Sequence, residues 1–120
     1  MELKDLEIYK ISRKLCAEAW KIYEKMNWQD KKTVGDQWIS SIDSIGANLA
    51  EGFGRYHFLD KNRFNYNARG SLLEAIHWTE LLEERNKLKP DEIKFFASEF
   101  QKLYPKLNKY IGSTRGQAIK

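Results

Sequence analysis

The sequence predicts an all-α protein that folds as an antiparallel up-down four-helix bundle. Apolar residues recur at helical spacing in four successive segments, and no segment has the strict apolar–polar alternation of a half-buried strand. Charged residues make up 32% of the chain and there are only two prolines, a composition that favours helices over a sandwich of short strands. Short connections between amphipathic helices are typical of bundles whose successive helices run in opposite directions.

The first helix is predicted from a stripe that spans about five turns. Asp5 and Glu7 lie near its start and Lys25 near its end, where each charge opposes the helix dipole. The stripe consists of Ile8, Ile11, Leu15, Ala19, Ile22 and Met26.

The second helix is predicted over residues 32–53, with Asp30 or Thr33 as the cap at its start. Gly46 interrupts its interior at a cost of about 1 kcal/mol relative to Ala, so we expect a packing reason for it. Its apolar stripe is Trp38, Ile42, Ile45 and Leu49.

The third helix is predicted to start after Asp60 as N-cap and to run to about Leu88, with Phe64, Ala68, Leu72, Ala75, Thr79 and Leu82 inside. Pro90, followed by two acids, marks the start of the fourth helix. We expect a kink at Pro105. Residues 1–111 are thus predicted to form the bundle, and residues 112–120 a flexible polar C-terminal tail.

Length and composition indicate one soluble domain. A chain of 120 residues has room for one core, and no apolar run reaches the roughly 18–20 residues of a membrane span. Cys16 is alone and the first ten residues do not resemble a signal peptide, so we expect a cytoplasmic protein. The net charge of +4 permits a nucleic-acid partner without requiring one.

The segment NLAEGFGRY (48–56) has two interpretations. A phosphate-binding loop needs a strand before it and a helix after it, whereas the residues before this segment have helical spacing. The favoured interpretation is that Gly52 or Gly54 ends the second helix in a left-handed conformation.

A polar stripe lies beside the apolar one on the second helix: Gln37, Ser41, Ser44, Asn48, Glu51 and Arg55. One interpretation is an ordinary solvated face. The other is a semi-buried network in which Asn48 and Glu51 join Ser71 and Glu74, or Arg69, of the third helix. Gly46, Ala47, Ala50 and Gly54 add a small-residue face that a neighbour can approach closely. A helix with three such faces favours self-association.

The motifs SIGANLAEGFGR (44–55) and ARGSLLEA (68–75), with Phe64 between them and DLEIYKISRKL near the start, resemble the bacterial ribosomal-RNA intervening-sequence (S23-like) proteins. That family is similar to the accessory variability determinant of diversity-generating retroelements. The resemblance covers almost the whole chain. It implies a four-helix bundle that assembles into a homo-oligomer, typically a pentameric ring, without established enzymatic activity. In the retroelement relatives it implies nucleic-acid contact.

Basic residues concentrate where the third helix starts and the fourth ends, which an antiparallel bundle brings to one pole. In a ring they would form a continuous rim that a polyanion can bind. Tyr56, His57, Phe58 and Tyr66 lie among them and are suited to stacking on bases. The alternative is that the cations solvate the bundle end and the aromatics pack there. The candidate contacts are Arg55, Lys61, Arg63, Arg69, Lys102, Lys106, Lys109 and Arg115.

Catalytic signals are weak, and we expect no catalytic residue, metal or cofactor. His57 and His77 belong to no paired metal motif, and Glu74 with His77 supplies one Glu-x-x-His where di-iron bundles use two. Arg13 and Lys14 are placed to lower the pKa of Cys16, although an idle thiol is the commoner case. The tryptophans are interpreted as core or interface anchors: Trp20, Trp28, Trp38 and Trp78.

The sequence therefore predicts a non-enzymatic binding or scaffold protein that binds copies of itself, with no membrane partner. The alternative is an accessory protein that binds RNA or DNA through a basic pole of a ring. A metal-dependent oxidase or nuclease is the third class, and it is the least supported by the residues.

Overall fold

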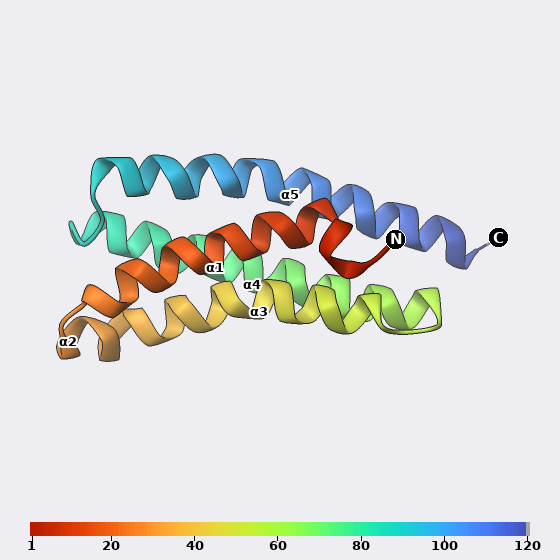
Figure 1. Ribbon diagram of the computed structural model, residues 1–120, viewed down its shortest axis with the longest axis horizontal. Coiled ribbons are helices and arrows are strands. Elements are labelled where there is room, and N and C mark those ends of the chain that lie inside the picture. Colours follow the sequence, from red (N-terminus) through yellow and green to blue (C-terminus); the bar gives the residue numbers. More distant parts are fainter. Residues whose placement is uncertain (120) are drawn as a thin grey trace.

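The computed structural model describes residues 1–119, and within them the chain is helical and contains no strand. Four long helices form a rod with extents of 50 × 23 × 22 Å (Figure 1). Figure 1 shows consecutive long helices running in opposite directions. The predicted all-α class is confirmed. The long helices are α1 (Glu7–Lys25), α3 (Asp36–Phe53), α4 (Phe58–Glu84) and α5 (Pro90–Ala118).

Three short elements extend the long helices. A 3-10 turn, η1 (Leu3–Asp5), precedes α1, while α2 (Trp28–Asp30) and the π-turn η2 (Lys31–Gly35) lead directly into α3. The second helical segment thus begins earlier than predicted. Its cap is Asn27, whose side chain accepts a hydrogen bond from Asp30 N at 2.8 Å, and not Asp30 or Thr33.

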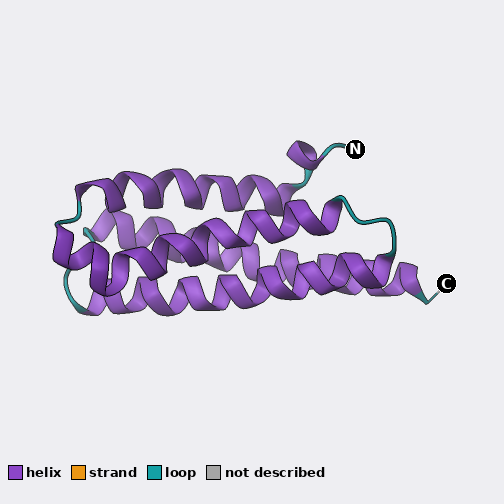
Figure 2. Cartoon of the chain, turned by 90° about the horizontal axis from the view of Figure 1, so that it is seen from below, coloured by secondary structure: helices purple, strands orange, loops and turns teal. Residues whose placement is uncertain are grey.

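The helices pack in a closed order around one core. α1 packs on α3 and α5, and α4 packs on the same two helices, so the α1/α3 side lies opposite the α4/α5 side (Figures 1 and 2). The largest fully buried side chains are Trp38 and Phe96, which meet edge to face at 5.5 Å. The rest of the core is mainly the predicted stripes of α1, α3 and α4 together with Leu103, Leu107 and Ile111 of α5, and burial of their apolar surface holds the helices together.

Gly46 and Gly52 are required by close packing. A Cβ at Gly46 would lie 2.9 Å from Ser12 Oγ of α1, and a Cβ at Gly52 would lie 2.9 Å from Lys61 O of α4. Gly46 therefore serves the contact between α3 and α1 within one chain. The prediction of a left-handed Gly52 or Gly54 is wrong, because no glycine in the described chain has positive φ and α3 ends at Phe53 with right-handed geometry.

α4 begins earlier and ends earlier than predicted. Its N-cap is His57 and not Asp60, and its last residue is Glu84. The left-handed residue lies here, at Asn86 with φ 59°. Lys87 N then donates to the carbonyl of Leu82 at 2.8 Å, the bond that closes a Schellman turn.

α5 starts as the sequence predicts, with Pro90 at its first turn and Lys89 N donating to Glu92 Oε1 at 2.8 Å. It continues through Pro105, which is exposed. It also continues through most of the segment predicted as a tail (112–120), because Thr114 is buried next to Ile111. The flexibility of that segment stays a prediction, and Lys120 lies outside the described residues.

Loops occupy the two ends of the rod, as Figure 2 shows. The α3–α4 turn and the end of α5 lie at one pole, and the α4–α5 turn lies with α2 at the other (Figure 1). None of the helices in residues 1–119 combines the length and apolar character needed to cross a bilayer.

Candidate nucleic-acid interface

The start of α4 and the end of α5 meet at one pole, as the sequence predicts. Asn62 Nδ2 donates to the carbonyl of Ile111 at 3.0 Å, and Asn65 Nδ2 donates to Asn62 Oδ1 at 2.9 Å. Both asparagines are at least 95% buried. Because buried amides need partners, this pair sets how α4 and α5 align at the pole.

Acids from the same pole neutralise two of the predicted contact residues. Arg55 Nη2 lies 2.6 Å from Glu51 Oε1, and Arg63 Nη2 lies 2.9 Å from Asp60 Oδ1. Both guanidinium groups also cover the Phe64 ring at 4.7 Å. These arginines are held by the protein itself and are less available to a ligand.

Two lysines of α5 are paired in the same way. Lys106 Nζ lies 3.3 Å from Glu7 of α1, and Lys102 Nζ lies 3.5 Å from Glu99. Glu99 is buried and also pairs with Lys14 of α1 at 3.3 Å. Glu7 lies on α1, so the charges of α4 and α5 alone do not reveal its pairing with Lys106.

The other arginines of the pole form a cluster without an acid. Arg69 and Arg115 lie on the Tyr66 ring, with guanidinium carbons 5.1 Å and 6.0 Å from its centroid. Arg69 Nη1 donates to Asn108 Oδ1 at 3.0 Å, and Arg115 Nη2 donates to the Tyr66 hydroxyl. Tyr66 is 37% exposed. Within residues 1–119 neither arginine has a carboxylate partner, so their charge is available to an anion.

The remaining candidates lie around this cluster. Lys61 Nζ donates to the carbonyl of Phe53 at 3.0 Å, which helps to close the α3–α4 turn. Lys109 is exposed on α5 beside Lys106, in a shallow hollow next to η1 and α1. Both add positive charge to the pole.

Three aromatic residues named as stacking candidates lie in the α3–α4 turn or at the first residue of α4. Tyr56 is 88% exposed and meets His57 edge to face at 5.0 Å. Phe58 is also exposed. The turn therefore presents aromatic faces at the same pole as the Tyr66 cluster.

The predicted polar network between α3 and α4 is absent from the described chain. Ser44 Oγ donates to Ser40 O, and Asn48 Nδ2 donates to Ser44 O, so both bonds stay within α3. Glu51 pairs with Arg55 on the same helix. On α4, Glu74 accepts from Trp78 Nε1 at 3.0 Å, and Ser71 is half-buried. A single chain leaves the Ser44–Asn48–Glu51 stripe at the surface.

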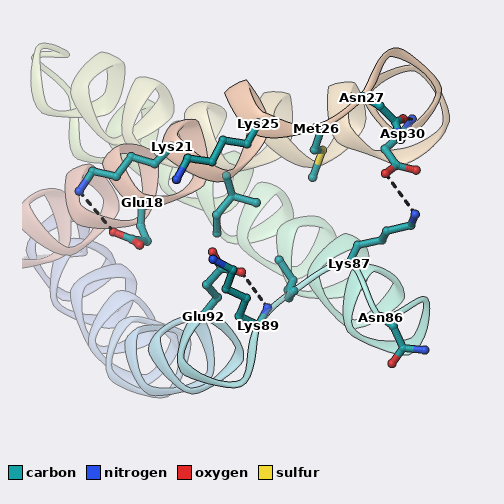
Figure 3. Close-up of a pocket in the computed structure, with 12 residues that line it drawn as sticks. Glu18, Lys21, Lys25, Met26, Asn27, Asp30, Asn86, Lys87, Lys89 and Glu92 are labelled. Atoms are coloured by element: carbon teal, nitrogen blue, oxygen red, sulfur yellow. Dashed lines mark hydrogen bonds and ion pairs between the residues drawn. The ribbon is translucent and has the colours of Figure 1, made fainter.

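The opposite pole carries a hollow of about 440 Å³ between the end of α1 and the α4–α5 turn (Figure 3). Its charges are mixed, and Figure 3 shows Lys87 paired with Asp30, 3.2 Å apart, and Lys21 paired with Glu18. Three acids therefore lie among the lysines of this hollow, whereas the Tyr66 cluster has no acid in the described chain. The basic character thus belongs to the Tyr66 pole.

Cys16 is not an activated thiol. Burial, together with hydrogen bonding and repulsion from the Asp43 carboxylate, raises the pKa of Cys16 to about 12. Its Sγ lies 3.9 Å from the carbonyl of Ile42. Arg13 does act to lower this pKa, as the sequence suggested, but the effects of burial and Asp43 are larger, which agrees with the favoured interpretation of an idle thiol.

No group of three or more His, Cys, Asp or Glu side chains placed to hold a metal occurs in residues 1–119. His77 stacks edge to face on Trp78 at 4.7 Å. Of the four tryptophans, Trp38 is fully buried, whereas Trp20 and Trp28 are 50% and 73% exposed. Trp38 is therefore the core anchor.

Sequence reasoning missed Asn62, Asn65, Asn108 and Glu99. The signal for the first two was present, since Asn62 and Asn65 continue the Ala68 and Leu72 stripe at spacings of three and four residues. Polar residues on an inner face are buried when they find partners. Glu99 had the same signal, because it lies three residues after Phe96 and four before Leu103. Asn108 had none, since its partner Arg69 lies on another helix.

Comparison with known proteins gives one family. The family model of the 23S rRNA-intervening sequence protein matches residues 4–109. No match was found among curated proteins. The matched span begins at η1, contains α1, α3 and α4, and ends within α5, so it covers the bundle and most of the basic pole. The chain belongs to the 23S rRNA-intervening sequence protein family.

Proposed function

We propose that this protein is a non-enzymatic four-helix bundle that self-assembles and serves as a scaffold or binding protein. The observation that supports it is exposed apolar surface on a small chain. Leu73 and Tyr104 are 48% and 39% exposed beside a groove between α4 and α5, and Trp20 is 50% exposed on the other side. Contiguous exposed apolar surface is typical of interaction sites.

The family resemblance extends this proposal. It favours a bacterial, cytoplasmic homo-oligomer in the form of a pentameric ring, related to the accessory variability determinant of diversity-generating retroelements. The polar stripe Ser44, Asn48 and Glu51 adds support, since its side chains bond only to α3 and leave capacity for a neighbouring subunit.

Sedimentation velocity and light scattering across the micromolar range test self-assembly. The expected result is a discrete mass that is a multiple of 14.2 kDa. A strict monomer at the highest concentration would reject the proposal.

A second candidate function is nucleic-acid binding at the basic pole, favoured by the Tyr66, Arg69 and Arg115 cluster. A guanidinium group without a carboxylate partner is suited to bind phosphate through paired hydrogen bonds. An exposed tyrosine next to it can stack on an unpaired base, as in other single-strand binding surfaces. A ring with parallel subunits would place several such clusters on one face.

Fluorescence anisotropy with labelled single-stranded RNA, single-stranded DNA and duplex tests this second function. Binding should weaken steeply as salt increases, because bound phosphates release counterions. The single strands should bind more tightly than the duplex if Tyr66 stacks on bases. No binding to any of the three at low salt would end this candidate while leaving the scaffold proposal intact.

A further inference from the structure

The groove between α4 and α5 is apolar within and acidic on one side. It has a volume of about 450 Å³, and its floor includes Ile76, Ile93 and Phe100. Leu73 and Tyr104 form its exposed apolar edge. Glu80 and Glu83 line its α4 side. In the described part of the chain these two carboxylates have no ion-pair partner.

The opposite side of the bundle presents a half-exposed aromatic pair with a lysine over one of its rings. Trp20 is half exposed on α1 and stacks on Tyr23 at 5.5 Å. Tyr23 donates to Asp36 of α3, which places the pair at the α1/α3 seam. Lys31 Nζ lies 5.0 Å from the Tyr23 ring centroid.

Trp20 and the groove lie at the same height along the rod. Cys16 Sγ meets Ile42 O, and Tyr23 meets Asp36, so Trp20 is level with the part of α3 between Asp36 and Ile42. Trp38, in that part, donates to Thr79 Oγ1, and Thr79 lines the groove. The α1/α3 and α4/α5 sides are opposite each other. A second copy placed beside the first with a parallel axis therefore presents its Trp20 at the height of the groove.

We infer that the α4/α5 groove receives Trp20 of a second copy of this chain in a head-to-tail interface. The inference rests on the proposed self-assembly and names its surface. An indole offers a large apolar surface to the groove, as tryptophan anchors do at protein interfaces. Lys31 lies over the Tyr23 ring on which Trp20 stacks, so in this interface it would approach the carboxylates Glu80 and Glu83, and the charges are complementary. Such a heterologous contact closes into a ring or extends as a filament.

A parallel arrangement of subunits also sets where their basic poles lie. Every subunit of such an assembly directs its Tyr66 cluster to the same end. The inferred interface thus gathers the unpaired arginines Arg69 and Arg115 of all subunits on one face.

Two variants, each defective in one half of the interface, provide the test. Trp20→Ala removes the indole that enters the groove, and Leu73→Glu places a third carboxylate at the groove. Both positions are about half exposed, so the fold should persist, as circular dichroism can check. Each variant alone should sediment as a monomer, with an association weakened roughly 30-fold or more, the usual effect of removing an interface anchor. The matched controls Trp28→Ala and Leu59→Glu change more exposed residues that neither line the groove nor stack with Trp20, and they should assemble like the parent chain.

Mixing the two variants makes the test specific for head-to-tail geometry. The Leu73→Glu chain retains Trp20 and the Trp20→Ala chain retains the groove, so an equimolar mixture should form a dimer with one complete interface. An assembly that survives both substitutions would overturn the inference while the scaffold proposal stands. Monomeric variants whose mixture stays monomeric would also overturn it. If the parent chain is itself monomeric and an apolar dye binds in its groove, both this inference and the proposed self-assembly are overturned.

Discussion

The indole Nε1 of Trp38 donates a hydrogen bond of 2.9 Å to Thr79 Oγ1 inside the core, joining α3 to α4. Trp38 is fully buried and Thr79 is 7% exposed. The same hydroxyl donates to the carbonyl of Ala75 at 2.7 Å. Thr79 thus provides the partner that a buried indole N–H needs.

Replacing Thr79 by Val should destabilise the fold by about 1–3 kcal/mol, because it leaves the indole N–H buried without a partner. Thr79→Ser keeps the hydroxyl and should cost less. Urea unfolding followed by tryptophan fluorescence measures both. Thr33→Val, at an exposed threonine of η2, is the control and should change stability little. Equal losses for Thr79→Val and Thr79→Ser would contradict the assigned role.

Gly46→Ala should destabilise the chain although Ala is the better helix former. The new Cβ would lie 2.9 Å from the buried Ser12 Oγ, and such overpacking costs roughly 1–3 kcal/mol. Gly70→Ala is the matched control, since nothing lies within 4 Å of its Cβ position and α4 should gain up to about 1 kcal/mol. Thermal melting of both variants against the parent chain measures these two changes in stability. A stabilised Gly46→Ala chain would show that α1 and α3 are not in close contact there.

Asn86→Gly should stabilise the protein by about 0.5–1 kcal/mol, because glycine adopts the positive φ of 59° without the cost of a Cβ. Asn86→Val should destabilise it, since a β-branched residue is strained in this region. Chemical unfolding of the two variants against the parent measures the difference. The opposite order would mean that the turn after α4 does not need a left-handed residue.

The pair Arg69→Gln and Arg115→Gln should reduce nucleic-acid affinity and lower the salt slope by about 2, roughly one unit per lost phosphate contact. The control pair Arg63→Gln and Lys106→Gln removes the same charge from residues that already pair with Asp60 and Glu7. It should have a smaller effect. Anisotropy titrations at several salt concentrations compare the pairs, and equal losses would indicate that only net charge matters.

Cys16 should react slowly with thiol reagents in the native protein. With the pKa raised from 9.0 to about 12, the thiolate fraction at pH 8 falls roughly 100- to 1,000-fold, and alkylation slows with it. Asp43→Asn removes one cause of the raised pKa and should speed the reaction. A native rate equal to that in urea would contradict the burial of this thiol.

The same shift gives a pH dependence of stability. Because the folded state holds the Cys16 proton more tightly than the unfolded state, this contribution is present below pH 9 and is lost as pH rises towards about 12. Cys16→Ser, measured across that range, should show a shallower loss of stability than the parent chain.

The local pattern of apolar residues was enough to predict the four long helices. The stripes of α1 and α3, the Pro90 start of α5 and the meeting of α4 with α5 at one pole are all as predicted. The helix ends were less predictable, because a cap depends on backbone geometry that several neighbouring residues can provide. Asn86 shows this, since it adopts the left-handed geometry that the sequence argument assigned to glycine.

The candidate site was predictable in position but not in composition. The sequence predicted a group of cations at one pole, yet it could not show that Arg55 pairs with Glu51 and Lys106 with Glu7 while Arg69 and Arg115 share Tyr66. The sequence by itself determined four amphipathic helices and a basic pole, because helical periodicity and charge content are local properties. Only the tertiary structure decided which charges stay unpaired and that Trp20 lies level with the α4/α5 groove, because those relations depend on which helices are neighbours and on their axial register.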